Sequence, residues 1–144
     1  MIQLELEFLS DADRRKKRLQ ERIRRNTEVD PETGCWRWTG KKTRANGGAA
    51  YPRITMRVPG YKTPRNLLAT RVSLEVFVES PPEGAEAAHD PELCPHTDCV
   101  NPGHLRWASR EENEADKRHP RRLRLREVHP PLHQLFYSDE LVPF

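Results

Sequence analysis

The chain has 144 residues, 33% of them charged and 35% hydrophobic, with 13 prolines and a formal net charge of +3. This length is typical of one domain with a modest core, and no apolar run approaches the roughly 20 residues that cross a bilayer. The opening residues do not form a signal peptide, and an odd number of cysteines disfavours a closed disulfide framework. We therefore expect a cytoplasmic protein without a membrane partner.

Positive charge is concentrated in two segments. One contains Arg14, Arg15, Lys16, Lys17, Arg18, Arg22, Arg24 and Arg25, and the other contains Lys117, Arg118, Arg121, Arg122, Arg124 and Arg126. Clustered cations suit a polyanion because they neutralise phosphates and release counterions. A solvated helix face explains either cluster equally well when it is taken alone.

Residues 1–30 are expected to form an N-terminal basic helix. Ser10 is a good N-cap, and acidic residues follow it in the first turn, where they favour the helix dipole. Leu19 and Ile23 form an apolar i, i+4 pair, so the helix has only a narrow stripe to dock. We expect it to lie on the surface.

Residues 31–119 are expected to form one domain that opens with an antiparallel meander. In residues 35–39, Trp36 and Trp38 alternate with Arg37 and Thr39, as in a strand. Further strands are expected at about 50–58 and 64–70. On the second strand one face carries Tyr51, Arg53, Thr55 and Arg57, and the other carries Ile54, Met56 and Val58.

The polar face of this meander is a possible DNA-reading surface, because arginine and asparagine bind guanine and adenine edges in the major groove. The residues expected to contact DNA are Arg37, Arg53, Thr55, Arg57, Arg65 and Asn66. For any one of them, an ordinary half-solvated sheet is the better explanation.

The second half of the domain is expected to be a core helix at 71–79 followed by a ββα unit. Residues 85–89 and 104–107 are the expected strands. Ser109 and Glu112 form an S-x-x-E capping box for a helix that continues to about Arg118. The box places Asn113 one turn inside this helix, directed back at the hairpin.

A metal-binding loop connects those two strands. Cys94, Cys99 and His104 are spaced C-x4-C-x4-H among turn-forming residues, and thiolates with an imidazole are the ligands that tetrahedral zinc prefers. The sequence therefore predicts a structural zinc. Two residues compete for the fourth position: Cys35, which would tie the tryptophan strand to the loop, and His96.

The run H…LC-x4-CVNPGHLRWAS-x3-N, with GCWRWTG at 34–40, resembles the HNH or His-Me finger (ββα-metal) endonucleases, and most closely the His-Cys box homing endonucleases. The resemblance covers about residues 34–118. It implies an α+β fold, with an antiparallel sheet followed by a zinc-stabilised nuclease core. It also implies that Cys35 completes the zinc site formed by Cys94, Cys99 and His104.

The same resemblance implies an active site for phosphodiester hydrolysis. His89 would be the general base, since a neutral imidazole titrates near working pH. Asn113 would hold one Mg²⁺ at the scissile phosphate and the 3′ oxygen. Arg53, in a YPR run where relatives often have YGR, would stabilise the phosphate, or else contact the DNA backbone.

Three features depart from the family pattern. Four residues separate His89 from Cys94 where the family has one, so Asp90–Glu92 look like an insertion. A strand distorted by it would leave His89 as a spare ligand or a surface histidine. Ala88 stands directly before His89, where many relatives carry a metal ligand, and this fits either a metal site with a single Asn or a weakened enzyme. Thr70 stands before Arg71, where the family motif often has a histidine.

Residues 120–144 are expected to form a C-terminal arm. Its apolar residues are Leu132, Leu135, Phe136, Tyr137, Leu141, Val142 and Phe144. So apolar an arm should fold back or cross to a second subunit. We expect a homodimeric, Mg²⁺-dependent endonuclease of phage or mobile-element type that leaves 5′-phosphate and 3′-OH ends on double-stranded DNA. The alternatives are a catalytically inactive zinc-stabilised DNA-binding protein and a monomeric nickase.

Overall fold

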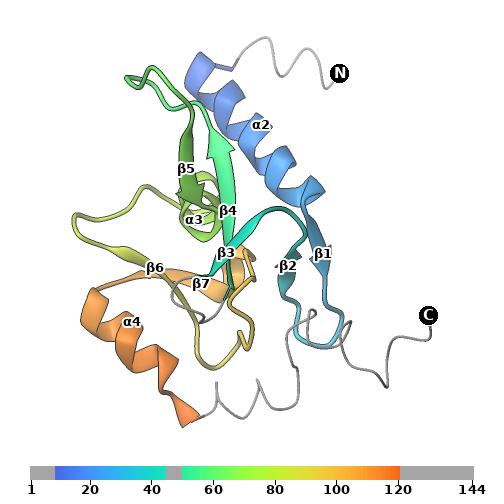
Figure 1. The fold of residues 1–144 in the computed structure, drawn as a ribbon, viewed down its shortest axis with the longest axis vertical. Helices are drawn as coiled ribbons and strands as arrows, with labels where there is room; N and C mark the ends of the chain where they lie inside the picture. The colour runs from blue at the N-terminus through green and yellow to red at the C-terminus, as the bar shows by residue number, and fades with distance from the viewer. Residues whose placement is uncertain (1–8, 45–49, 121–144) are drawn as a thin grey trace.

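The computed structural model describes residues 9–44 and 50–120, which form a small α+β fold (Figure 1). In chain order the elements are α2 (Asp11–Arg25), β1 (Thr27–Val29), β2 (Trp36–Trp38), β3 (Lys42–Arg44), β4 (Ala50–Met56), β5 (Arg65–Leu68), α3 (Ala69–Phe77), β6 (Glu86–His89), the 3-10 turn η1 (Pro102–His104), β7 (Leu105–Ala108) and α4 (Arg110–Lys117). None of these helices has the length and apolar character needed to cross a membrane. The predicted arm at 120–144, and with it the dimer contact, lies outside the described residues apart from Pro120.

Helix α2 begins as predicted, because the Ser10 side chain accepts a hydrogen bond from the backbone N–H of Asp13. Leu19 and Ile23 are buried, and Gln20 Nε2 donates to the Val76 carbonyl of α3 at 2.5 Å. The main hydrophobic core consists of Leu19, Ile23, Trp38, Ile54, Met56, Ala69, Val72, Val76 and Val100. The narrow stripe of α2 is therefore part of the same core as the domain predicted at 31–119.

The alternation predicted for β4 is confirmed. Pro52, Ile54 and Met56 are buried, while Thr55 between them is exposed. Strand β5 pairs antiparallel with β4, with Arg53 opposite Leu68. The apolar face of this hairpin lies on the core and its polar face lies toward solvent.

The meander itself differs from the prediction. Strand β2 pairs with β1 in a separate two-stranded sheet, and β3 takes the place beside β4. Both unforeseen strands, β1 and β3, have only three residues, too few for an alternation pattern to appear. The sheet that faces solvent is therefore β3–β4–β5.

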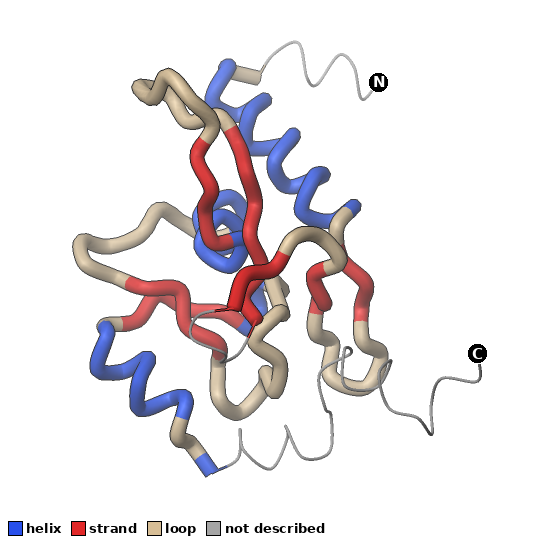
Figure 2. The backbone as a smooth tube through the Cα atoms, in the orientation of Figure 1, coloured by secondary structure: helices blue, strands red, loops and turns tan. Residues whose placement is uncertain are grey.

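The predicted hairpin and helix in the second half are confirmed. Strands β6 and β7 pair antiparallel with His89 opposite Leu105, and the chain then enters α4 (Figure 2). Ser109 caps α4 by accepting a hydrogen bond from Glu112 N at 3.2 Å. Arg106 of β7 donates to Asp116 of α4 at 2.6 Å, which fixes the helix against the hairpin.

Candidate metal centre and adjoining cleft

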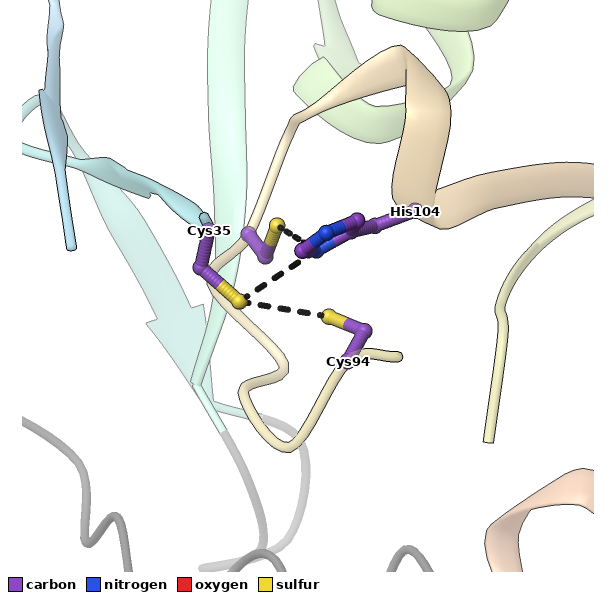
Figure 3. A group of neighbouring side chains, drawn as sticks. Cys35, Cys94 and His104 are labelled. Atoms are coloured by element: carbon purple, nitrogen blue, oxygen red, sulfur yellow. Dashed lines mark hydrogen bonds between the residues drawn. The ribbon is translucent and has the colours of Figure 1, made fainter. Parts of the chain in front are cut away.

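Three cysteines and one histidine converge from two distant parts of the chain. Cys35 lies directly before β2, Cys94 and Cys99 lie in the loop after β6, and His104 ends η1. Figure 3 shows Cys35, Cys94 and His104 directed toward a common point. The ligand atoms of all four residues lie within 4.8 Å of one another, and the three thiols are fully buried. This group could bind a metal ion such as zinc.

The distances within the group agree with a tetrahedral zinc. With Zn–S of about 2.3 Å and Zn–N of about 2.0–2.1 Å, a tetrahedral angle gives S···S of about 3.8 Å and S···N of about 3.6 Å. Cys35 Sγ lies 3.7 Å from Cys94 Sγ and 3.5 Å from His104 Nδ1, and Cys99 Sγ lies 3.6 Å from the same nitrogen. The residues therefore fit the ion in both chemistry and spacing.

The three thiols influence one another. Hydrogen bonds from Cys94 and Cys99 lower the pKa of Cys35. The Cys35 sulfur raises the pKa of Cys94 in turn, and burial raises the pKa of Cys99. A bound metal ion would stabilise all three as thiolates.

His96, the rival fourth ligand, lies outside this group. Its side chain is buried, and its Nε2 lies 3.5 Å from Asp30 Oδ2. Burial, and then the charge of Arg37, lower the pKa of His96. Of the two residues left open by the sequence, Cys35 is therefore the one that joins the other ligands.

The predicted DNA contact at Arg37 is wrong. Arg37 is only 3% exposed and its Nε donates to Asp98 Oδ1 at 2.6 Å, while Lys42 Nζ contacts the other oxygen of Asp98 at 3.0 Å. Burial raises the pKa of Asp98, but the hydrogen bonds and charges of Arg37 and Lys42 outweigh that effect and lower it. Arg37 therefore ties β2 to the ligand loop and cannot reach a groove.

A cleft of about 460 Å³ lies on the other side of strand β6. It is lined by Tyr51, Arg53, Leu68, Thr70, Arg71, Glu86, Ala87, His89, Asn113 and Lys117. The three predicted catalytic residues, His89, Asn113 and Arg53, are thus brought together from β6, α4 and β4. Nothing in their sequence spacing required the β4 strand to meet the ββα unit at this point.

His89 occupies a fixed position at the end of β6. It is 5% exposed, and its Nε2 lies 3.0 Å from the carbonyl oxygen of Cys99. Because a carbonyl only accepts, Nε2 carries the proton in this contact, and Nδ1 is the nitrogen that can take up another. The hydrogen bond also links His89 directly to the ligand loop.

The segment Asp90–Glu92 leaves strand β6 intact. Asp90 N donates to the His104 carbonyl at 2.7 Å, which continues the β6–β7 ladder past His89. Cys94 N then donates back to the Asp90 carbonyl at 2.9 Å, so the extra residues close into a turn. His89 is therefore neither a spare ligand of the Cys/His group nor a surface histidine.

Glu86 is a cleft residue that the sequence did not single out. Asn113 Nδ2 donates to Glu86 Oε2 at 2.9 Å, which places carboxylate and carboxamide oxygens in one corner of the cleft. Hard oxygen donors of this kind suit Mg²⁺, which uses few protein ligands. Glu86 lies two positions before Ala88 and therefore on the same face of β6.

Three cations complete the cleft. Arg53 is oriented by a hydrogen bond from its Nε to Thr43 Oγ1 at 2.8 Å. Arg71 donates to the Ala85 carbonyl at 2.8 Å and lies 5.1 Å from the Trp107 ring centroid. Arg53, Arg71 and Lys117 all line the cleft and place positive charge along it.

The remaining predicted DNA contacts lie away from the cleft. They are four exposed residues of the β4–β5 hairpin, namely Thr55, Arg57, Arg65 and Asn66, and the Arg65 guanidinium lies 4.4 Å from the Tyr61 ring centroid.

Comparisons of the chain with protein-family models, with curated proteins and with solved structures gave no match.

Proposed function

We propose that the chain is a zinc-stabilised, Mg²⁺-dependent DNA endonuclease of the HNH or His-Me finger type, closest to the His-Cys box homing endonucleases. The observation that carries the proposal is the cleft in which His89, Asn113 and Arg53 meet beside two further cations, Arg71 and Lys117. Two of these residues come from a hairpin and helix, and Arg53 comes from a separate sheet. A general base, a pair of oxygen ligands and phosphate-binding cations are the components that phosphodiester hydrolysis requires.

The zinc in this proposal is structural. Cys35, Cys94, Cys99 and His104 would supply all four ligands of a tetrahedral zinc, which would leave no position for a reacting water. The ion would instead fasten the loop that carries the Cys99 carbonyl, and that carbonyl holds His89. Zinc would therefore support the reaction by keeping the general base in position.

His89 acts on the attacking water. Its Nδ1 removes a proton as the water oxygen attacks phosphorus, and the bond from phosphorus to the 3′ oxygen breaks. The departing 3′ oxygen is protonated from solvent, so the products carry a 5′-phosphate and a 3′-OH. The Cys99 carbonyl stabilises the resulting imidazolium through the Nε2 proton, as the orienting partner of a catalytic histidine does.

The metal subsite would be formed by the Asn113 side-chain oxygen and the Glu86 carboxylate. Mg²⁺ bound there would supply positive charge at the scissile phosphate and at the departing oxygen. Arg53 would hold a non-bridging phosphate oxygen, because Thr43 engages only its Nε. Arg71 and Lys117 would neutralise the neighbouring phosphates.

The proposed substrate is double-stranded DNA, and the proposed active form is a homodimer. Cutting both strands requires one active site for each, and a two-fold dimer supplies them. The apolar residues of the segment 120–144 are the sequence feature that motivates the dimer.

The experiment is a plasmid-cleavage assay with the unmodified chain, His89→Ala, Asn113→Ala and the matched control His119→Ala, a histidine that does not line the cleft. Mg²⁺ is omitted rather than chelated, since a chelator would also strip zinc. We expect Mg²⁺-dependent cutting that both cleft variants lose and the control keeps, with equal zinc content in all four proteins. Plasmid that is bound but never cut would instead favour the catalytically inactive DNA-binding protein, and singly nicked plasmid from a monomer would favour the nickase.

A further inference from the structure

Helix α2 is fixed beside strand β4 by two arginine side chains. Arg15 Nη2 donates to the Arg57 carbonyl at 2.9 Å, and Arg22 Nη2 donates to the Thr55 carbonyl at 2.7 Å. Ile23 of the same helix is fully buried in the core. These contacts hold the helix in one rotational setting, so each of its other cations has a defined direction.

Arg18 and Arg25 are exposed on the side of α2 that faces away from the core. They are two turns apart and therefore lie in line, roughly 130° around the helix axis from the buried Leu19 and Ile23. Glu21 lies between them on that side. Even so, the ion pairs found within residues 9–44 and 50–120 include neither arginine. These two guanidinium groups form a stripe, here called the α2 stripe, whose charge is not used inside the described fold.

Strand β4 runs between the cleft and helix α2. Arg53 lines the cleft, and Arg57, whose carbonyl accepts from Arg15, lies four residues further along the same face, about 13 Å at the usual rise of a strand. Figure 1 shows α2 and α4 at opposite ends of the molecule with β4 between them. A polyanion that enters the cleft and follows β4 therefore arrives at α2.

We propose that Arg18 and Arg25 of the α2 stripe bind backbone phosphates of the DNA duplex whose scissile phosphate lies in the cleft. This inference rests on the proposed function. Seven residues of helix span about 10 Å, which matches roughly three phosphate spacings of one strand measured along the duplex axis. Contacts of this kind position the duplex and carry no sequence information, so the α2 stripe adds affinity for every sequence alike.

The test measures binding without cleavage, in a His89→Ala background and without added Mg²⁺. Fluorescence anisotropy follows a mixed-sequence duplex several helical turns long over a range of salt concentrations. Arg18→Gln/Arg25→Gln is compared with Lys16→Gln/Lys17→Gln, which removes the same charge from exposed positions on a different side of the same helix. Thermal melting and zinc content verify that all proteins are folded.

We expect the stripe variant to bind at least about tenfold more weakly near physiological salt, and its log–log salt slope to fall in magnitude by about 2, since each phosphate contact contributes about 0.9. The control pair should change neither quantity. If both variants lost the same affinity for DNA, net charge alone would explain the effect and the proposal would be refuted. An unchanged salt slope in the stripe variant would also refute it. A duplex RNA bound more tightly than the DNA, with the same dependence on Arg18 and Arg25, would overturn the choice of partner.

The two proposals fail in different ways. If the chain never cuts DNA but the stripe variant loses affinity and salt slope as stated, the nuclease is refuted, and only the contact between the α2 stripe and DNA phosphates remains supported. A chain that cuts DNA and whose stripe variant binds normally would do the reverse.

Discussion

The Cys/His group makes a sharp prediction about Cys35. This residue is the only one of the four ligands that lies outside the segment 94–104, so it is the one ligand through which the metal would connect β2 to the ligand loop. Replacing it by serine, Cys35→Ser, should release the metal and loosen the loop. The matched control is His96→Gln, which alters the other buried candidate ligand while leaving the four-residue group complete.

The size of the effect follows from what else holds the loop. Within the described residues, Val100 is the only loop residue of the main core. The loop is also held by the Arg37–Asp98 ion pair and by backbone hydrogen bonds from Val100 N to Trp36 O at 2.9 Å and from Trp38 N to Asp98 O at 3.0 Å. Structural zinc binds with about 10–16 kcal/mol, so losing one of four ligands costs about 3 kcal/mol or more. For a domain of this size that lowers the Tm by about 10 °C.

The assay is zinc content by mass spectrometry of the native protein, together with thermal melting. The unmodified chain and His96→Gln should each carry about one zinc per chain, and Cys35→Ser much less, with the lower Tm given above. Acidification should release the metal from the unmodified protein, because protons compete with the metal ion for the thiolate and imidazole ligands. A Cys35→Ser protein that keeps both its zinc and its Tm would refute the assigned ligand set.

Three further predictions concern stability and the cleft. Asp98→Asn breaks a buried ion pair with Arg37 and should lower the free energy of unfolding, measured with urea, by about 3–5 kcal/mol. Glu114→Gln on the surface should leave that free energy unchanged. Because the folded-state pKa of Asp98 is lowered, its stabilisation is present at neutral pH and should be lost as the pH falls toward that value; a difference between the two proteins that persists in strong acid would contradict this. Ser109→Ala removes the N-cap of α4 and should lower the free energy of unfolding by about 1 kcal/mol. An unchanged free energy of unfolding would show that the cap does not stabilise the fold. Glu86→Gln should raise the Mg²⁺ concentration required for cleavage and leave zinc content unchanged; an unaltered Mg²⁺ titration would remove Glu86 from the metal subsite.

Several features could be predicted from the sequence because their causes are local. The C-x4-C-x4-H spacing placed Cys94, Cys99 and His104 in one group, and the serine caps of α2 and α4 set where those helices begin. The period-two burial of β4 followed directly from its alternating residues. In each case the deciding interaction lies within a few residues of the chain.

The features that the sequence did not predict depend on contacts between residues far apart in the chain. Arg37 looked solvent-facing because its partner Asp98 is 61 residues away, and that ion pair fills the second face of β2. Glu86 was overlooked because its contact with Asn113 spans 27 residues. Local alternation separates the faces of a strand, but only the packed fold decides whether the polar face is covered.

The most direct test of the proposed nuclease is chemical rescue of the general base. Single-turnover cleavage of a sequence-diverse DNA pool is measured for His89→Ala and Asn113→Ala, with and without added imidazole, and the new ends are sequenced. We predict that imidazole restores cutting to His89→Ala at the sites used by the unmodified chain, with 5′-phosphate ends, and restores nothing to Asn113→Ala. Full cutting by His89→Ala without imidazole would contradict the assignment of the general base and, with it, the cleft as the active site.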